Sequence, residues 1–153
     1  TILEKTSDAY ERYYAFINRN LNLYAPCEET WCRLKTIDFE AMITQRITNT
    51  RYLYDNLKSK TFRFVYETWD ENSVPMTVPV YVDPEQREQI VSTLFDRNVL
   101  LSTLIDKWDF IPEHQTDEFL MEKQYIDSHL LTPVNEFLSI NQMGKMVEIL
   151  NEI

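Results

Sequence analysis

The sequence predicts an α+β fold in which two N-terminal helices precede a small mixed sheet covered by helices. Apolar residues recur at helical spacing near both ends of the chain, and aromatic and β-branched residues are concentrated between them. Hydrophobic residues make up 44% of the 153 positions, which is enough for a packed core. We expect an N-terminal helix and loop over residues 1–36 and an α+β domain over residues 37–153.

The N-terminal part is predicted to contain a helix, a loop and a second helix. Apolar residues recur at helical spacing from Ile2 to Arg19. Asparagines and Pro26 follow, so residues 21–35 are predicted to form a loop. The second helix is predicted over Asp38–Leu57. Its expected buried seam consists of Ile43, Ile47, Thr50 or Arg51, Tyr54 and Leu57.

Two strands are predicted next, and they can pair as a hairpin. The first is Phe62–Trp69, which is rich in aromatic and β-branched side chains, and the second is Met76–Val82. The polar residues between them supply a turn. Pro79 cannot donate a ladder hydrogen bond, so we expect the second strand to lie at an edge or to carry a bulge.

A third predicted helix begins at Asp83, because Pro84 suits the first helical position and Gln86 stands at capping-box spacing. Asn98 tolerates the left-handed conformation that often ends a helix. Leu100–Ile105 is then predicted as a buried strand. A right-handed crossover unit results if the strands on either side of this helix are parallel neighbours.

The C-terminal part is predicted to hold two more helices. One covers Asp117–Asp127. Leu130–Val134 is a short apolar stretch that Pro133 interrupts. Ser139 and Gln142 have capping-box spacing and mark the start of the last helix. That helix is expected to bury Met143, Met146, Val147 and Leu150.

Charge and glycine content exclude several classes of function. The net charge of −10 argues against nucleic acid and anionic membrane as partners, since both need a basic surface. No apolar run approaches the ~18 residues of a membrane helix. Gly144 is the only glycine, and phosphate-binding loops need several, so a P-loop or Rossmann site is excluded on this chain.

The candidate reactive side chains are few. Cys27 and Cys32 are interpreted as free cytosolic thiols, although a disulfide across the short loop is geometrically possible. His114 and His129 lie in no motif and are interpreted as surface residues. Adjacent carboxylates are expected on solvated faces or in first helical turns. The residues themselves therefore predict no catalytic group and no metal site.

Aromatic residues are dense between Phe62 and Trp69. Core packing is the favoured interpretation, and an exposed patch that docks another domain or subunit is the alternative. Trp108 follows a predicted strand, where a rigid scaffold can aim a binding side chain. Packing at the edge of the core is the simpler interpretation of Trp108.

The order of motifs resembles a known domain. Arg46, Asn49, Leu53 and Leu57 follow the pattern R-x-x-N-x-x-x-L-x-x-x-L on the second predicted helix, and a leucine-proline segment with Pro133 precedes the final helix. From Asp38 onward the chain resembles the C-terminal small domain of fold-type-I, pyridoxal-phosphate-dependent aminotransferases. The DegT-type sugar aminotransferases are the most similar, and Arg46, Asn49 and Pro133 are the structural family match.

The resemblance implies a C-terminal portion of a sugar-nucleotide aminotransferase-like protein, with Trp108, Lys107 and Asp106 at the edge of the substrate pocket. The family holds pyridoxal phosphate in a large domain that is not recognisable here. We therefore expect no cofactor on this chain and no activity from it alone. Lys107 also stands where the family often has histidine, and Asp109 where it has proline.

The implied partner is the missing large domain or a second copy in a homodimer, and the expected location is the cytoplasm. Two other hypotheses stay open. The chain can be a stand-alone, non-enzymatic interaction domain that keeps the small-domain fold, or an unrelated enzyme with acid-based chemistry. If a large domain is missing, an exposed apolar surface is expected on the N-terminal helices where that domain should dock. An enzyme with acid-based chemistry needs two carboxylates whose environments shift their pKa values in opposite directions.

Overall fold

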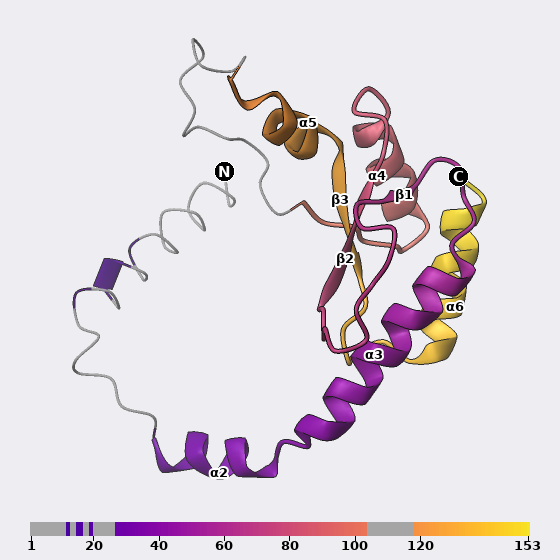
Figure 1. Ribbon diagram of the computed structural model, residues 1–153. Coiled ribbons are helices and arrows are strands. Elements are labelled where there is room, and N and C mark those ends of the chain that lie inside the picture. The colour runs from indigo at the N-terminus through magenta and orange to yellow at the C-terminus, as the bar shows by residue number, and fades with distance from the viewer. Residues whose placement is uncertain (1–11, 13–14, 17–18, 20–26, 104–117) are drawn as a thin grey trace. The chain divides into compact units, whose positions relative to one another are not determined.

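The computed structural model describes residues 12, 15–16, 19, 27–103 and 118–153, and contacts divide the chain into two units, Thr1–Asp38 and Phe39–Ile153. Most of the first predicted helix lies outside the described residues. In the first unit Glu28–Thr36 forms helix α2, so the predicted loop over residues 21–35 is wrong there (Figure 1). Acidic residues in its first turn and basic residues in its last turn complement the helix dipole.

The second unit contains a three-stranded antiparallel sheet with the order β1-β2-β3 (Figure 1). The strands are β1 (Arg63–Phe64), β2 (Thr77–Tyr81) and β3 (His129–Pro133). The predicted hairpin is confirmed, because β1 and β2 pair antiparallel. The first strand is much shorter than the predicted Phe62–Trp69, and the described sheet is antiparallel rather than mixed.

Strand β3 arises from the short apolar stretch Leu130–Val134, for which no strand was predicted. It pairs antiparallel with β2 along its whole length, and Pro133 is its last residue, where a lost donor does little harm. On its other edge β3 meets Ser102 in an isolated antiparallel bridge. Because β3 lies between β2 and Ser102, the predicted crossover between parallel neighbours does not form.

Pro79 lies in the central strand, so the prediction of an edge strand is wrong. The Val65 amide donates to the Pro79 carbonyl at 3.2 Å, which places both main-chain groups of Pro79 on the β1 side. Proline has no amide hydrogen, so Pro79 cannot donate to β1 at the position of Val65, and β1 ends at the preceding residue, Phe64. The proline explains why the pairing of β1 with β2 is so short.

The four helices described in this unit are α3 (Phe39–Asn56), α4 (Arg87–Asp96), α5 (Leu120–Ser128) and α6 (Ile140–Asn151). The α3 and α6 predictions are confirmed, and these two helices pack side by side (Figure 1). The Ser139–Gln142 capping box is present at the start of α6. None of the described helices has the length and apolar character needed to cross a membrane.

The start of α4 differs from the prediction. The helix begins at Arg87 rather than near Asp83, because the residues after Asp83 form a turn. The Glu85 amide donates to Asp83 Oδ1 at 3.0 Å, and the Gln86 amide donates to the Asp83 carbonyl at 3.0 Å. At the other end Asn98 has a φ of 61°, which confirms the left-handed residue after the helix.

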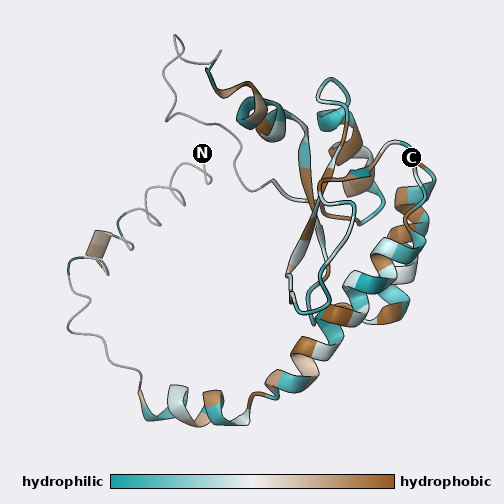
Figure 2. Cartoon of the chain, in the orientation of Figure 1, coloured by the Kyte–Doolittle hydropathy of each residue, from teal (hydrophilic) through white to brown (hydrophobic). Residues whose placement is uncertain are grey.

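The core lies between one face of the sheet and the helices α3, α4 and α6, which lie to one side of it in Figure 1. In Figure 2 each of these three helices carries hydrophobic residues, drawn in brown, between hydrophilic ones. The α6 face was predicted correctly. The seam of α3 was predicted in part, because Thr50 and Leu57 are buried as expected. Ile43 is 43% exposed instead, and Asn49, which was not in the predicted seam, is fully buried. The largest fully buried apolar side chains are Leu53, Leu94, Leu130, Met143, Leu150, Val80 and Val134.

Candidate functional site

The predicted pocket-edge residues Asp106, Lys107 and Trp108 lie outside the described residues. The structure does describe the segment that leads into them. Leu101 is buried, and Ser102 exchanges two main-chain hydrogen bonds with Leu131 on β3, at 3.3 and 2.7 Å. The last described part of this segment is therefore anchored at the edge of β3.

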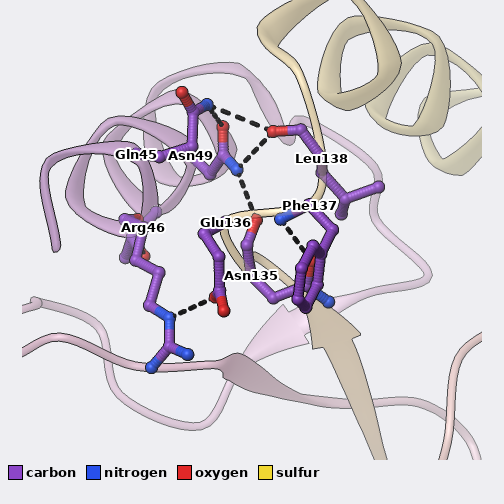
Figure 3. A network of polar contacts seen from close by, with 8 residues as sticks. Gln45, Arg46, Asn49, Asn135, Glu136, Phe137 and Leu138 are labelled. Atoms are coloured by element: carbon purple, nitrogen blue, oxygen red, sulfur yellow. Dashed lines mark hydrogen bonds and ion pairs between the residues drawn. The ribbon is translucent and has the colours of Figure 1, made fainter. Parts of the chain in front are cut away.

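The residues of the family pattern come together at one end of the domain. Figure 3 shows Arg46 and Asn49 on α3 facing the loop of residues 134–139, which joins β3 to α6. Pro133 is the last residue of β3 and stands directly before this loop. The structure thus places Arg46, Asn49 and Pro133 in one region, although its functional role remains a prediction.

Asn49 is fully buried, and its side chain makes three hydrogen bonds. Its amide nitrogen donates to the main-chain carbonyls of Asn135 and Leu138, each at 2.9 Å (Figure 3). Its Oδ1 accepts from Gln45 Nε2 at 2.9 Å, and Gln45 also donates to the Leu138 carbonyl. A buried amide with its donors and acceptor satisfied holds a loop in a single arrangement.

Arg46 reinforces the same contact through charge. Its Nε lies 2.6 Å from Glu136 Oε2, and both side chains are largely shielded from solvent. The hydrogen bond from Arg46 holds the pKa of Glu136 below its ordinary value, and the same bond raises the pKa of Arg46. The pair is therefore charged at neutral pH and ties the loop to α3.

Sequence reasoning missed three residues of this network, two in the loop and one on α3. Glu136, Asn135 and Gln45 were not identified, because each is an ordinary polar residue in its local context. One local signal was present for Asn135, whose Oδ1 accepts from the Phe137 amide at 3.1 Å and forms an Asx turn. The pairing of Arg46 with Glu136 joins residues 90 positions apart, and no local pattern predicts it.

An apolar cavity of about 520 Å³ is lined by this loop and α6. Asn135 and Leu138 line it from the loop, and Met146 and Ile149 line it from α6. Leu100, which is 66% exposed, borders it as well. The lining offers apolar contact and a few polar groups, which suits packing or binding rather than bond-making chemistry.

His129 is fully buried, so its interpretation as a surface residue is wrong. It begins β3, and its ring stacks on Tyr125 with centroids 4.4 Å apart. Its Nδ1 lies 2.8 Å from the Tyr125 carbonyl. His114 lies outside the described residues. The described part of the chain holds no group of three or more His, Cys, Asp or Glu side chains that could bind a metal ion.

The aromatic stretch from Phe62 to Trp69 is partly packed in the core and partly exposed. Phe62 is buried in the core, and Phe64 stacks on Tyr54 with centroids 4.2 Å apart. Tyr66 is 64% exposed. The Tyr54 hydroxyl donates to the Tyr66 carbonyl at 3.1 Å, and burial raises the pKa of Tyr54. Packing therefore accounts for Phe62 and Phe64, whereas Tyr66 is exposed and Trp69 is half-buried.

Both cysteines are free and exposed, as predicted. Cys27 Sγ lies 3.3 Å from Thr30 Oγ1, and this hydrogen bond lowers the pKa of the thiol below its ordinary value. Cys27 stands at the N-terminal end of α2, which is a common setting for such a contact.

The described residues do not fit pyridoxal phosphate. That cofactor needs a lysine in an enclosed pocket, a carboxylate for its ring nitrogen and a cradle for its phosphate. Every lysine in the described part of the chain is exposed on the surface: Lys35, Lys58, Lys60, Lys123 and Lys145. None of the described lysines is therefore placed to hold the cofactor.

Comparison with known proteins shows the fold. No protein-family profile matches the sequence, and no curated protein sequence matches it. Among solved structures, Spr1654 of Streptococcus pneumoniae, a protein assigned as a sugar aminotransferase, is similar in its PMP form with a TM-score of 0.62 and 10% identity. Its apo form gives 0.58 and 11%. The aminotransferase TlmJ of Streptoalloteichus hindustanus gives 0.52 and 14%.

These likenesses cover 72–74% of this chain and 31% of each of those chains. The chain therefore spans about a third of the length of the proteins that it resembles. At such low identity the comparison establishes an α+β fold shared with part of an aminotransferase, and nothing about activity.

Proposed function

We propose that this chain is the C-terminal portion of a pyridoxal-phosphate-dependent, DegT-type sugar-nucleotide aminotransferase-like protein. In this proposal it forms one side of the substrate pocket and is inert alone. The observation that carries the proposal is the structural likeness, which covers 74% of this chain but only 31% of Spr1654. A domain that matches a third of an enzyme is expected to depend on the remainder for its chemistry.

Two features of the domain support a partner. On α3, which carries the family pattern at Arg46 and Asn49, Phe39 and Ile43 are 55% and 43% exposed. On α2, Trp31 is 53% exposed. Apolar side chains of this size at the surface favour burial against another domain or subunit. The large domain, or a second copy of the chain, is the proposed partner.

The exposed lysines support the proposed lack of activity. A cofactor held by a large domain needs no lysine from this chain, and each lysine in the described part of the chain is exposed on the surface. Trp108, Lys107 and Asp106 are proposed to reach the substrate from the segment that follows Ser102. The cytoplasmic location expected from the sequence belongs to the same proposal.

Cofactor binding by the 153-residue chain is the first test. Pyridoxal phosphate is added, any lysine adduct is reduced with borohydride, and labelled peptides are mapped by mass spectrometry. We expect weak labelling that is spread over the exposed lysines. Its distribution among the lysines should be the same as in the chain unfolded in urea. Labelling concentrated on one lysine of the folded chain would show a cofactor site on this chain and contradict the proposal.

The role in the pocket is tested in the natural gene product. Its intact mass is measured first, and we expect more than the 18.4 kDa of this chain. In an active gene product Trp108→Ala should raise the KM for the amino acceptor, whereas Phe95→Ala, at a 67% exposed position on α4, should leave KM unchanged. A gene product of 18.4 kDa that binds a protein partner would instead favour the stand-alone interaction domain.

A further inference from the structure

We propose that a polar cavity beside Tyr81 binds the phosphate group of a small molecule. The cavity has a volume of about 490 Å³ and lies where the start of β1, the end of β2 and the turn before α4 meet α5. Its lining includes Lys60, Arg63, Tyr81, Asp83, Gln86 and Gln124. The inference does not depend on the proposed function, which rests on the structural likeness and on residues 106–108 rather than on the lining residues named here.

The first argument is unneutralised positive charge. Lys60 and Arg63 both line the cavity, in a chain whose net charge is −10. Neither forms a salt bridge with a residue that the structure describes. The salt bridges of the described residues engage Arg33, Arg46, Arg51, Arg97 and Lys123 instead. Two free cations in one concave site favour an anion there.

The second argument is that the position of Arg63 is supported. Its guanidinium carbon lies 5.5 Å from the centroid of the Tyr81 ring. Tyr81 meets the edge of Tyr125 at 6.0 Å, and Tyr125 stacks on the buried His129. This row of rings supports the guanidinium without an acidic partner. A guanidinium presents a planar pair of donors that matches two oxygens of a phosphate, and the Lys60 ammonium adds a second charge.

The third argument concerns size and the neutral groups. A cavity of about 490 Å³ is within the range of small-molecule sites and exceeds what a bare phosphate fills. The amides of Gln86 and Gln124 can hydrogen-bond the rest of a phosphorylated compound. We therefore infer a phosphate monoester as the ligand class rather than inorganic phosphate alone.

The negative charge of Asp83 is expected to repel a phosphate in this cavity, so removal of that charge tests the inference. Asp83 is the carboxylate of the cavity lining, and its Oδ1 accepts from the Glu85 amide at 3.0 Å. Asp83→Asn keeps an oxygen for that hydrogen bond but removes the negative charge. The variant should therefore bind a phosphate several times more tightly than the natural chain does.

Binding is measured by isothermal titration calorimetry on the 153-residue chain at constant ionic strength, with glycerol 3-phosphate, inorganic phosphate and succinate as probes. We expect glycerol 3-phosphate to bind most tightly. Arg63→Gln and Lys60→Gln should each weaken it by about fivefold or more, and Arg63→Lys should also weaken it because the paired donors are lost. Lys145→Gln, an exposed lysine on α6 outside this cavity, should bind as the natural chain does.

Three results would overturn the inference. One is no binding of either phosphate by the natural chain. Another is an equal loss of affinity in Lys145→Gln, which would show general attraction rather than a site. The third is succinate binding as tightly as glycerol 3-phosphate, which would make the ligand a dicarboxylate. Circular dichroism of each variant confirms that loss of affinity is not loss of fold.

Discussion

The side-chain amide nitrogen of Asn49 lies 2.9 Å from the main-chain carbonyl oxygen of Asn135, a residue 86 positions later in the chain. This hydrogen bond joins the middle of α3 to the loop before α6 (Figure 3). Asn49 is fully buried, so its amide would be left unsatisfied if this hydrogen bond were lost while the side chain stayed buried. Formation of this end of the domain therefore requires segments from both ends of the second unit.

Asn49→Asp should destabilise the domain strongly. The substitution keeps the size of the side chain but replaces the amide donor with a carboxylate that faces two carbonyl oxygens. We expect a loss of about 3 kcal/mol in the free energy of unfolding, measured by urea titration at pH 7. Asn141→Asp is the matched control, since Asn141 is exposed in the first turn of α6. Equal stability of the two variants would show that the buried network contributes little.

Glu136→Gln should alter how stability depends on pH. The folded-state pKa of Glu136 is lowered by Arg46, so ionisation of Glu136 stabilises the fold above the ordinary value of 4.5. This contribution is lost as the pH falls from 4.5 through the lowered folded-state pKa. The natural chain should therefore exceed Glu136→Gln in stability at pH 7, and the difference should shrink in acid.

The measurement is the urea midpoint of both chains between pH 7 and pH 3. Glu67→Gln, which changes an exposed glutamate, serves as control and should follow the natural chain at every pH. A gap between the natural chain and Glu136→Gln that stays constant across the whole pH range would mean that the ion pair does not contribute as described.

Ser139→Ala should weaken α6. Ser139 Oγ accepts from the Gln142 amide, and Gln142 Oε1 accepts from the Ser139 amide at 2.9 Å. Loss of a side-chain cap costs about 1 kcal/mol, and thermal unfolding should show it as a lower Tm. Ser139→Thr retains an oxygen acceptor and should recover most of the loss. Failure of the threonine variant to recover stability would point to a cause other than capping.

Thr132→Val should stabilise the domain. Thr132 is fully buried on the core side of β3, and its hydroxyl has no hydrogen-bond partner among the residues that the structure describes. Valine has nearly the same shape and removes the unsatisfied group, so we expect a gain of about 1 kcal/mol in urea unfolding. Thr50→Val is the control, because the Thr50 hydroxyl donates to the Arg46 carbonyl at 2.8 Å. A gain in Thr50→Val as large as that in Thr132→Val would contradict the explanation.

Local signals explain which elements were predictable. The helix α6 was predicted from its capping box and from four apolar residues on one face, both of which act within a few positions of sequence. The helix α2 was missed, although Glu28 and Glu29 in its first turn and Arg33 in its last turn are also local signals. Pro26 and the asparagines before it were given too much weight.

The seam of α3 shows where local reasoning fails. Ile43 has the apolar character of a core residue but is exposed, and Asn49 is polar but fully buried. Which face of a helix is buried depends on the segments that pack against it. Here the loop at Asn135 supplies carbonyl acceptors to Asn49, and such partners cannot be inferred from α3 alone.

The sequence by itself determined the α+β class, the extent of α3 and α6, and the exclusion of a glycine-rich phosphate loop, because these depend on periodicity, capping and composition. Only the tertiary structure decided the antiparallel order of the sheet, the central place of β2, and the union of Arg46 with Glu136. It also placed Lys60 and Arg63 in one cavity. The sheet order and the Arg46–Glu136 pair join residues far apart in sequence, and the cavity brings Lys60 and Arg63 together with the distant Gln124. These interactions form only once the chain has folded.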